Sequence, residues 1–492
     1  MSVPAIQQET VALLQRLAGA PPVETHISLV FVGADTVWKL KKAVRLPFLD
    51  FTRVEDRHHF AARELALNAP AAPGLYRDLV PVVRGADGGL ALDAGGGPAV
   101  DWVLRMARVP ADDFLDVMAA QARIGPSQQD ALADAVAAYH AALPPVRGVV
   151  PPMRDIALGN ARSALEAGLP EPAVIAWQAA MLPALDTAAS WMAQRAQDGF
   201  VRRAHGDLHL GNLCLWQGRP VPFDALEFDE AMATIDLGYD LAFLLMDLDH
   251  RVDRSAGNRV LNRYIARNGD SGMLRGMPAF LSMRAMVRAH VEARVGHQEP
   301  AAGYLAAAAV YLVPPPPVVI AIGGLPGTGK STLARALAPS LGAAPGALIL
   351  RSDEIRKRRF GVAPEQRLPP AAYAPDVSEA VFAALFAAAG KAAAAGHAVI
   401  ADATFLDPSH RAGIAAAASA AGVPFHGFWL QAPLSELEAR VSGRQGDASD
   451  ATVEVLRRAA RTDPGAGSWQ PIDATDARKA QQAIDAALSA IS

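Results

Sequence analysis

Two separate groups of residues in this chain have the composition of a phosphoryl-transfer site. The first group contains Asp207, in the sequence His-Gly-Asp-Leu-His-Leu-Gly-Asn, Asn212 at the end of that sequence, and Asp224 after it. Phosphoryl transfer needs a base or positioning group for the acceptor hydroxyl, oxygen ligands for magnesium and a cation for the nucleotide phosphates. Asp207 can accept the proton of the acceptor, and Asn212 and Asp224 can bind magnesium through side-chain oxygens.

The second group is a phosphate-binding loop between an apolar strand and a helix, which is the context that this motif requires. Its glycines let main-chain amides point at a phosphate, its lysine reaches the β- and γ-phosphates, and its serine hydroxyl ligates magnesium. The residues expected to bind the nucleotide are Gly324, Leu325, Pro326, Gly327, Thr328, Gly329, Lys330, Ser331 and Thr332.

Residues that follow this loop favour a kinase over a motor or a switch. Asp353 follows the second strand of this half and would face the cleft as the base for an acceptor, and Arg356 could bind an acceptor anion. Asp402 ends an apolar strand, where an aspartate that positions magnesium or water is expected. Arg440 and Arg444 are four residues apart and would share a helix face that reaches over the transferring phosphate.

The region of about residues 24–311 resembles the aminoglycoside phosphotransferase family, which shares the eukaryotic protein-kinase-like fold. The His-Gly-Asp-x-x-x-x-Asn loop and the later aspartate carry the resemblance. It implies that Asp207 is the catalytic base and that Asn212 and Asp224 are magnesium ligands. The fold accepts many hydroxyl compounds, so the acceptor stays open.

The same resemblance implies a lysine that contacts the nucleotide phosphates and an ion-pair partner, Glu64, in the following helix. We choose Lys39 as this lysine, but Lys41 points to the same face of the strand and stays open. Residues around Met106 would form the hinge that receives adenine. The sequence departs from the family in one respect, because only Gly33 is present where a glycine-rich phosphate loop is expected.

Residues of about 318–463 resemble the P-loop kinases of the polynucleotide kinase, zeta-toxin and gluconate kinase kind. The phosphate-binding loop, Asp353 with Arg356, and Asp402 carry this resemblance. It implies a base at Asp353 and leaves a sugar, a nucleotide sugar and a polynucleotide end open as acceptors. The chain as a whole resembles bacterial two-domain proteins predicted to be kinases. We expect the basic run of residues 356–359 to be a solvated helix face.

The spacing of apolar residues predicts two kinds of fold. The expected elements of the first are strands at 27–32, 36–41, 79–83 and 100–106 and helices at 54–68, 130–142 and 171–197. After residue 318 strands and helices alternate, which predicts a parallel sheet wound with helices. We therefore expect an α+β two-lobed protein-kinase-like domain followed by an α/β P-loop NTPase domain.

Four consecutive prolines at 314–317 interrupt an apolar stretch that is long enough to span a bilayer. Because proline removes amide donors and stiffens the chain, we interpret the stretch as a helix end, a rigid spacer and a new strand. The predicted domains are therefore residues 1–313, with a small lobe to about 105 and a large lobe after it, and residues 318–492.

The composition excludes several classes of protein. The 492 residues are 51% hydrophobic and 20% charged, which is typical of a globular chain with more than one domain. The net charge of −4 does not favour nucleic acid as a default partner. Cys214 is the single cysteine, so no intrachain disulfide forms, and its apolar neighbours predict a buried thiol. We read no export signal and expect a cytoplasmic location.

We therefore predict a bifunctional phosphotransferase that depends on ATP and magnesium. We expect it neither to bind a membrane nor to need an obligate protein partner. Its expected catalytic residues are Asp207, Asp353 and Lys330, and its expected magnesium ligands are Asn212, Asp224, Ser331 and Asp402. The N-terminal acceptor would be a small hydroxyl compound, and the C-terminal acceptor a second one or a nucleic-acid end. One alternative is a single active P-loop kinase or ATPase with a nucleotide-binding regulatory N-terminal domain. Another is an ATPase switch that drives a partner.

Overall fold

The structure is a computed structural model that describes residues 4–46, 49–85, 87–93, 97–443, 448–463, 465 and 469–489. By compactness the chain divides into two units, Met1–Pro151 with Ala193–Asp240, and Pro152–Met192 with Leu241–Ser492. This division crosses two helices and differs from the boundary expected at the prolines. The domain limits taken from the sequence stay a prediction.

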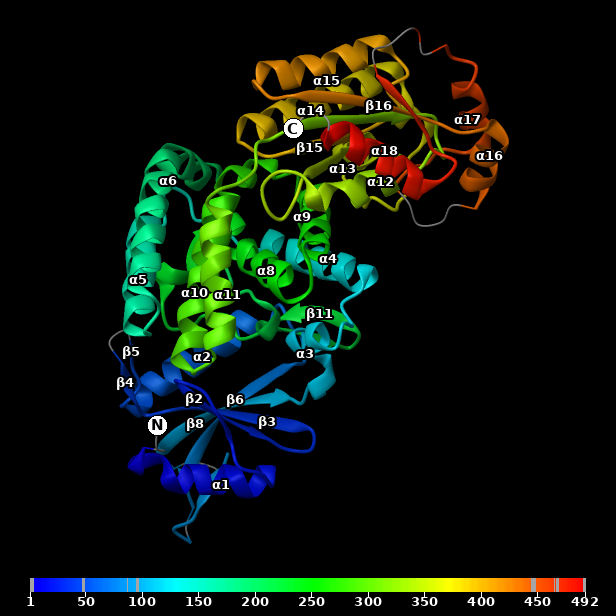
Figure 1. The fold of residues 1–492 in the computed structure, drawn as a ribbon. Coiled ribbons are helices and arrows are strands. Elements are labelled where there is room, and N and C mark those ends of the chain that lie inside the picture. The colour runs from blue at the N-terminus through cyan, green and yellow to red at the C-terminus, as the bar shows by residue number, and fades with distance from the viewer. Residues whose placement is uncertain are drawn as a thin grey trace. The chain divides into compact units, whose positions relative to one another are not determined.

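The first unit contains an antiparallel sheet of six strands in the order β1-β2-β3-β8-β6-β7. The strands are β1 (Val23–Glu24), β2 (Ser28–Val32), β3 (Thr36–Lys41), β6 (Tyr76–Arg84), β7 (Leu90–Leu92) and β8 (Ala99–Ala107). Leu40 of β3 packs with Leu14 of α1 (Gln8–Ala18) on one face of the sheet. Helix α2 (Val54–Asn68) covers the other face (Figure 1). Since side chains alternate along a strand, Lys39 and Lys41 face α2.

The remainder of the first unit carries short strands and helices. They are β4 (Arg45–Leu46), β5 (Leu49–Asp50), α3 (Leu115–Ala120), α4 (Pro126–Ala142), β9 (Val201–Arg203), β10 (Leu213–Trp216), β11 (Arg219–Pro222), α7 (Glu230–Ala233) and β12 (Thr234–Asp236). Strands β10 and β11 form an antiparallel hairpin, and β9 pairs with β12. Asp207 follows β9 and Asp224 follows β11, so the hairpin returns the chain toward the loop of Asp207.

The second unit begins with helices. They are α5 (Met153–Glu166), α6 (Glu171–Asp198), α8 (Leu237–Arg251), α9 (Arg254–Asn268), α10 (Met277–Arg294) and α11 (Gln298–Tyr311). Helix α10 packs against α5 and α11. Helix α11 ends before the prolines and the next strand begins at Val319, so the interpretation of the apolar stretch as helix end, spacer and strand is confirmed.

The second unit also contains a five-stranded parallel sheet in the order β14-β15-β13-β16-β17, as the alternation of strands and helices predicted. The strands are β13 (Val319–Gly324), β14 (Leu348–Arg351), β15 (Val399–Asp402), β16 (Phe425–Gln431) and β17 (Gln470–Asp473). Strand β13 is central, with β15 on one side and β16 on the other. In open α/β sheets ligands bind at the carboxyl ends of the strands, at such a switch point.

Helices cover both faces of this sheet (Figure 1). They are α12 (Lys330–Leu337), α13 (Ser352–Arg359), α14 (Pro375–Ala394), α15 (Pro408–Ala420), α16 (Leu434–Ser442), α17 (Val453–Ala459) and α18 (Ala477–Ser489). Helices α12 and α18 contact each other, and Leu337 and Ile484 pack with Ile320 and Ile322 of β13. Helix α14 contacts α15, β14 and β15. In the described part of the chain, α14 alone is long and apolar enough to cross a membrane by length and composition.

Candidate functional site

Two lysines of β3 and a glutamate of α2 form an ion-pair network in the first unit. Lys39 Nζ lies 2.7 Å from Glu64 Oε1 and 2.5 Å from Asp224 Oδ1. Lys41 Nζ lies 2.6 Å from Glu64 Oε2 and also contacts Glu227. Burial raises the pKa of Glu64, but the ammonium groups of the two lysines outweigh it and lower that pKa to about 2. Glu64 is therefore ionised and holds both lysines.

The two lysines differ in the carboxylate that each contacts besides Glu64. Lys39 contacts Asp224 and lines a cavity, whereas the Lys41 side chain is 3% exposed and contacts Glu227. Burial raises the pKa of Glu227, although Lys41 opposes this effect. Lys39 therefore has the position that a phosphate-binding lysine needs, next to an expected magnesium ligand. The choice of Lys39 over Lys41 stays a prediction.

The loop after β9 presents Asp207, whose side chain is 42% exposed. Asn212 Nδ2 donates to the main-chain oxygen and to Oδ2 of Asp207, both at 2.9 Å. Asp240 of α8, which is fully buried, accepts from the main-chain amides of His205 at 3.2 Å and Gly206 at 2.9 Å. Asp240 therefore fixes the main chain that precedes Asp207.

Asp224 is held by two residues that the sequence did not single out. Its φ of 60° lies in the left-handed region, and its amide donates to Tyr76 Oη at 3.0 Å. The next amide, of Ala225, donates to Asn68 Oδ1 at 2.9 Å. Tyr76 and Asn68 thus fix the main chain that aims the Asp224 carboxylate at Lys39.

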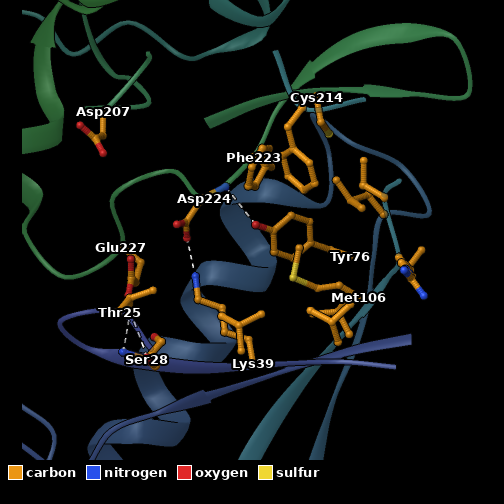
Figure 2. Close-up of a pocket in the computed structure, with 18 of the residues that line it drawn as sticks. Thr25, Ser28, Lys39, Tyr76, Met106, Asp207, Cys214, Phe223, Asp224 and Glu227 are labelled. Atoms are coloured by element: carbon orange, nitrogen blue, oxygen red, sulfur yellow. Dashed lines mark hydrogen bonds and ion pairs between the residues drawn. The ribbon is translucent and has the colours of Figure 1, made fainter. Parts of the chain in front are cut away.

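A cavity of about 590 Å³ lies beside these groups (Figure 2). This volume is within the usual range for small-molecule sites. Figure 2 shows Lys39 and Asp224 facing each other at one side of the cavity, with Tyr76 next to them. Its wall includes the apolar residues Val30, Val37, Met106, Phe114 and Phe223, and the acidic residues Asp207, Asp224 and Glu227. Met106 thus lines the cavity where adenine is expected.

Cys214 also lines the cavity. It is fully buried, and burial raises the pKa of its thiol to about 12. Because the thiolate is the nucleophilic form, this thiol is a packing group, as the apolar neighbours predicted.

The phosphate-binding loop has the main-chain conformation that its glycines allow. Gly324, Gly327 and Gly329 have φ values of 135°, 89° and 88°. A Cβ atom on Gly324 would lie 2.6 Å from the main-chain oxygen of Leu430, so that position requires glycine. Helix α12 begins at Lys330, whose Nζ donates to the main-chain oxygens of Gly324 and Leu325, both at 2.9 Å.

The residue after Lys330 pairs with the aspartate expected to hold the metal. Ser331 Oγ donates to Asp402 Oδ2 at 2.5 Å. Asp402 ends β15 opposite Ile322, and Arg351 Nε lies 3.3 Å from the same oxygen. Thr332 is exposed on α12. The structure therefore brings Lys330, Ser331 and Asp402 together at the carboxyl edge of the parallel sheet.

Asp353 and Glu354 lie in the first turn of α13, which begins at Ser352 directly after β14. Burial raises the pKa of Asp353, although Arg351 and Lys330 partly oppose it. Burial likewise raises the pKa of Glu354, whose carboxylate accepts from Arg351 Nη1 at 3.0 Å. The charge of Lys330 thus acts on the pKa of Asp353, and the role of Asp353 as a base stays a prediction. Glu354 is a further acidic residue of this site that the sequence did not indicate.

The basic run of α13 is more buried than expected. Arg356 is 6% exposed and Lys357 is fully buried, so a solvated helix face is wrong for these two residues. Arg356 donates to the main-chain oxygen of Ala372 at 2.6 Å, and its guanidinium lies 4.8 Å from the ring centroid of Tyr373. Its guanidinium binds the protein itself, and its role toward an acceptor stays a prediction.

The expected lid arginines are not both described. Arg440 of α16 donates to the main-chain oxygens of Ala474 and Thr475, both at 2.9 Å. These contacts direct its side chain to the turn after β17 and not over the loop. Arg444 lies outside the described residues.

Both sites offer oxygen ligands of the kind that magnesium prefers. In the first unit the Asn212 amide nitrogen is bonded to Asp207, so its amide oxygen and the Asp224 carboxylate are the oxygens that would hold the expected metal. In the second unit the Ser331 hydroxyl and the Asp402 carboxylate already meet. Both sets fit magnesium. Among the described residues, no group of three or more histidine, cysteine, aspartate or glutamate side chains forms a metal site.

Comparisons with known proteins define the class of the C-terminal part. The family model described as an AAA domain (AAA_33) matches residues 319–462. This match and the main-chain conformation of the loop support a P-loop nucleotide-binding domain in that part of the chain, which is the coarser half of the prediction.

The chain is also similar to particular proteins. It is 27% identical to Uncharacterized protein Rv2004c of Mycobacterium tuberculosis (strain ATCC 25618 / H37Rv), over 88% of each chain. Among solved structures, glucosamine kinase in complex with glucosamine, ADP and inorganic phosphate is 20% identical with a TM-score of 0.40, over 63% of this chain and 87% of that one. A gluconokinase from Sinorhizobium meliloti 1021 is 21% identical with a TM-score of 0.25, over 36% and 95%.

Proposed function

We propose that this chain is an ATP- and magnesium-dependent phosphotransferase with two sites, each of which transfers the γ-phosphate to a hydroxyl acceptor. The observation that carries the proposal is the contact of Ser331 with Asp402 next to Lys330, at the end of a phosphate-binding loop. Asp353 lies within electrostatic reach of Lys330 and supplies the group that a kinase needs for its acceptor.

In the C-terminal site the main-chain amides of the loop and Lys330 bind the phosphates. Magnesium held by Ser331 and Asp402 would neutralise the charge that develops on the phosphates. Asp353 accepts the proton of the acceptor hydroxyl as the new oxygen–phosphorus bond forms. Burial raises the pKa of Asp353, which makes its ionised form a better proton acceptor than an exposed carboxylate.

The N-terminal site supports an aminoglycoside phosphotransferase-like activity with roles for Lys39, Glu64 and Asp207. Glu64 fixes Lys39, which binds the nucleotide phosphates in the cavity. Asp207 is exposed and is oriented by Asn212, so it can accept the proton of a small hydroxyl compound. Asn212 and Asp224 would hold the metal. The C-terminal acceptor is a second hydroxyl compound or a nucleic-acid end.

The test is transfer of γ-labelled phosphate from ATP into a small-molecule extract, a nucleic-acid fraction and a desalted protein fraction. Wild type is compared with Asp207→Asn and Lys330→Ala, and with Asp155→Asn and Lys391→Ala as controls at exposed positions. We expect Asp207→Asn and Lys330→Ala to abolish different labelled products and the controls to abolish none. If Lys330→Ala removes all labelling and Asp207→Asn removes none, the N-terminal unit is a nucleotide-binding regulatory module and the two-site proposal fails.

A further inference from the structure

Helix α9 covers the outer edge of the parallel sheet in the second unit. Strand β14 lies at one end of the described sheet, in the order β14-β15-β13-β16-β17, and α9 contacts both β14 and α13. The outer edge of an end strand presents main-chain N–H and C=O groups that need partners. The Leu348 amide donates to the Ala398 oxygen next to β15, so the amide of the following residue, Ile349, points to the outer edge.

Two asparagines of α9 are the partners on this edge. Asn262 Oδ1 accepts from the Ile349 amide at 2.6 Å, and Asn262 Nδ2 donates to the Ala347 oxygen at 3.1 Å. Asn258 Nδ2 donates to the same oxygen at 3.0 Å, and Asn258 is 2% exposed. A carboxamide has the donor and acceptor of a peptide group, so the Asn262 side chain pairs with residues 347 and 349 as a neighbouring strand would.

The strand that these asparagines hold leads directly to the proposed acceptor base. Strand β14 ends at Arg351, and Asp353 lies in the first turn of α13, which begins at the next residue. Helix α9 also holds the far end of α13, because Arg358 Nη1 donates to the Ala266 oxygen at 3.3 Å. A Cβ atom on Gly269, just after α9, would lie 2.9 Å from Arg358 Nε, so the chain approaches this side chain closely. Helix α9 therefore holds the main chain both before and after Asp353.

We propose that Asn262, together with Asn258, is a positioning residue of the C-terminal site: by fixing β14 it holds Asp353 where an acceptor hydroxyl can meet the nucleotide. The inference rests on the proposed function of this site. It extends the site to a helix that precedes the four prolines, outside the predicted domain of residues 318–492. Asn262 acts on the transfer step through the main chain of β14 and α13.

This role is separable from nucleotide binding. The phosphate-binding loop follows β13, and β15 lies between β13 and β14 in the sheet. Loss of the α9 bonds should therefore displace Asp353 while the loop and Lys330 stay in place. A displacement of about 1 Å can lower a rate by about 100-fold. The expected signature is a slower transfer with unchanged nucleotide affinity, which a general loss of stability would not give.

The experiment compares the wild-type full chain with Asn262→Ala, Asn258→Ala and Ser255→Ala, the last at an exposed position of α9. Hydrogen exchange of the Ile349 amide reports whether its bond to α9 is lost. Calorimetry with magnesium and a non-hydrolysable ATP analogue gives the part of the nucleotide binding that Lys330→Ala abolishes. Transfer from γ-labelled ATP into a small-molecule extract and a nucleic-acid fraction gives the rate that depends on Lys330.

The largest change is expected for Asn262→Ala. The Ile349 amide should exchange faster and transfer should fall more than about 10-fold, with a nucleotide affinity within about 3-fold of wild type. Asn258→Ala should have a smaller effect, because Asn262 still bonds to both main-chain groups. Ser255→Ala should change none of the three measurements.

Three results would overturn the inference. If Asn262→Ala transfers phosphate at the wild-type rate, or leaves the exchange of the Ile349 amide unchanged, this bond does not position Asp353 and the proposed function stands. If transfer and nucleotide affinity fall together, the asparagine only stabilises the fold, and the proposed function again stands. If wild type shows no transfer that depends on Lys330, the proposed function of the site fails together with the inference.

Discussion

The two candidate sites hold their lysines with different kinds of group. Lys330 is bonded to main-chain oxygens of its own loop, and the loop depends on three glycines with positive φ. Lys39 is bonded to the carboxylates of Glu64 and Asp224, which lie on segments far apart in the sequence. The C-terminal site therefore depends on main-chain shape, and the N-terminal site depends on buried charge. A substitution that changes only a buried charge should therefore affect the N-terminal site, and one that changes only main-chain shape should affect the C-terminal site.

The largest effect is expected when one buried cation of the N-terminal site is removed. Lys41→Met leaves Glu227 buried without its cation and should lower the free energy of unfolding of the first unit by about 3–5 kcal/mol. Hydrogen exchange of the β3 and β8 amides measures this loss in the first unit alone. Lys391→Met, at an exposed position of α14, is the control. A loss below about 1 kcal/mol, the range of surface pairs, would show that buried charge does not hold this site together.

The second prediction concerns pH. Because the folded state lowers the pKa of Glu64 from 4.5 to about 2, its stabilising contribution is complete above pH 4.5 and is lost as the pH falls toward 2. The contribution is on the order of 3 kcal/mol. The difference in unfolding free energy between wild type and Glu64→Gln should therefore shrink between pH 6 and pH 3 in urea titrations. An equal difference at both pH values would contradict the ion-pair network, since other carboxylates cancel in this comparison.

The sequence predicted those elements that have a clear apolar period. Strand β3 and helix α2 have the predicted limits, because alternation and helical spacing are both strong there. For helix α13 the sequence predicted only a helix face at residues 356–359, exposed to solvent; its start at Ser352 and its burial were not predicted, because most of its residues are charged and its burial comes from tertiary partners. Helix α12 ends at Leu337, and a 3-10 turn that includes Pro339 follows it, because proline does not continue an α-helix.

The difference between local patterns and contacts of distant residues also explains which site residues the sequence could indicate. The phosphate-binding loop is continuous in the chain, so its residues are visible as one motif. Tyr76 and Asn68 act through single hydrogen bonds to main-chain amides 148 and 157 residues away, and such bonds leave no local pattern. Asp240 acts in the same way, because it accepts hydrogen bonds from main-chain amides 34 and 35 residues away. Residues that position others through the main chain can therefore be recognised only in the structure.

The third prediction tests main-chain shape in the C-terminal site. Gly324→Ala places a Cβ against the main-chain oxygen of Leu430 at a φ of 135° and should cost about 1–3 kcal/mol of backbone strain. We expect nucleotide binding to fall by about 10-fold or more, because 1.4 kcal/mol is a factor of ten in affinity. Gly443→Ala is a matched control, because its Cβ would meet nothing closer than 3.6 Å. Equal binding by the two variants, measured by calorimetry, would show that the loop tolerates another main-chain shape.

The smallest effect is expected at Arg440. Its bonds to the oxygens of Ala474 and Thr475 are partly exposed, so Arg440→Ala should cost about 0.5–1 kcal/mol of stability. If the side chain only fastens the turn after β17, kcat for the C-terminal reaction should change less than about 3-fold, as for Arg478→Ala on the exposed face of α18. A fall in kcat of more than about 100-fold would mean that Arg440 leaves this turn and reaches the transferring phosphate, as the sequence suggested. The C-terminal site would then depend on a mobile charge as well as on main-chain shape.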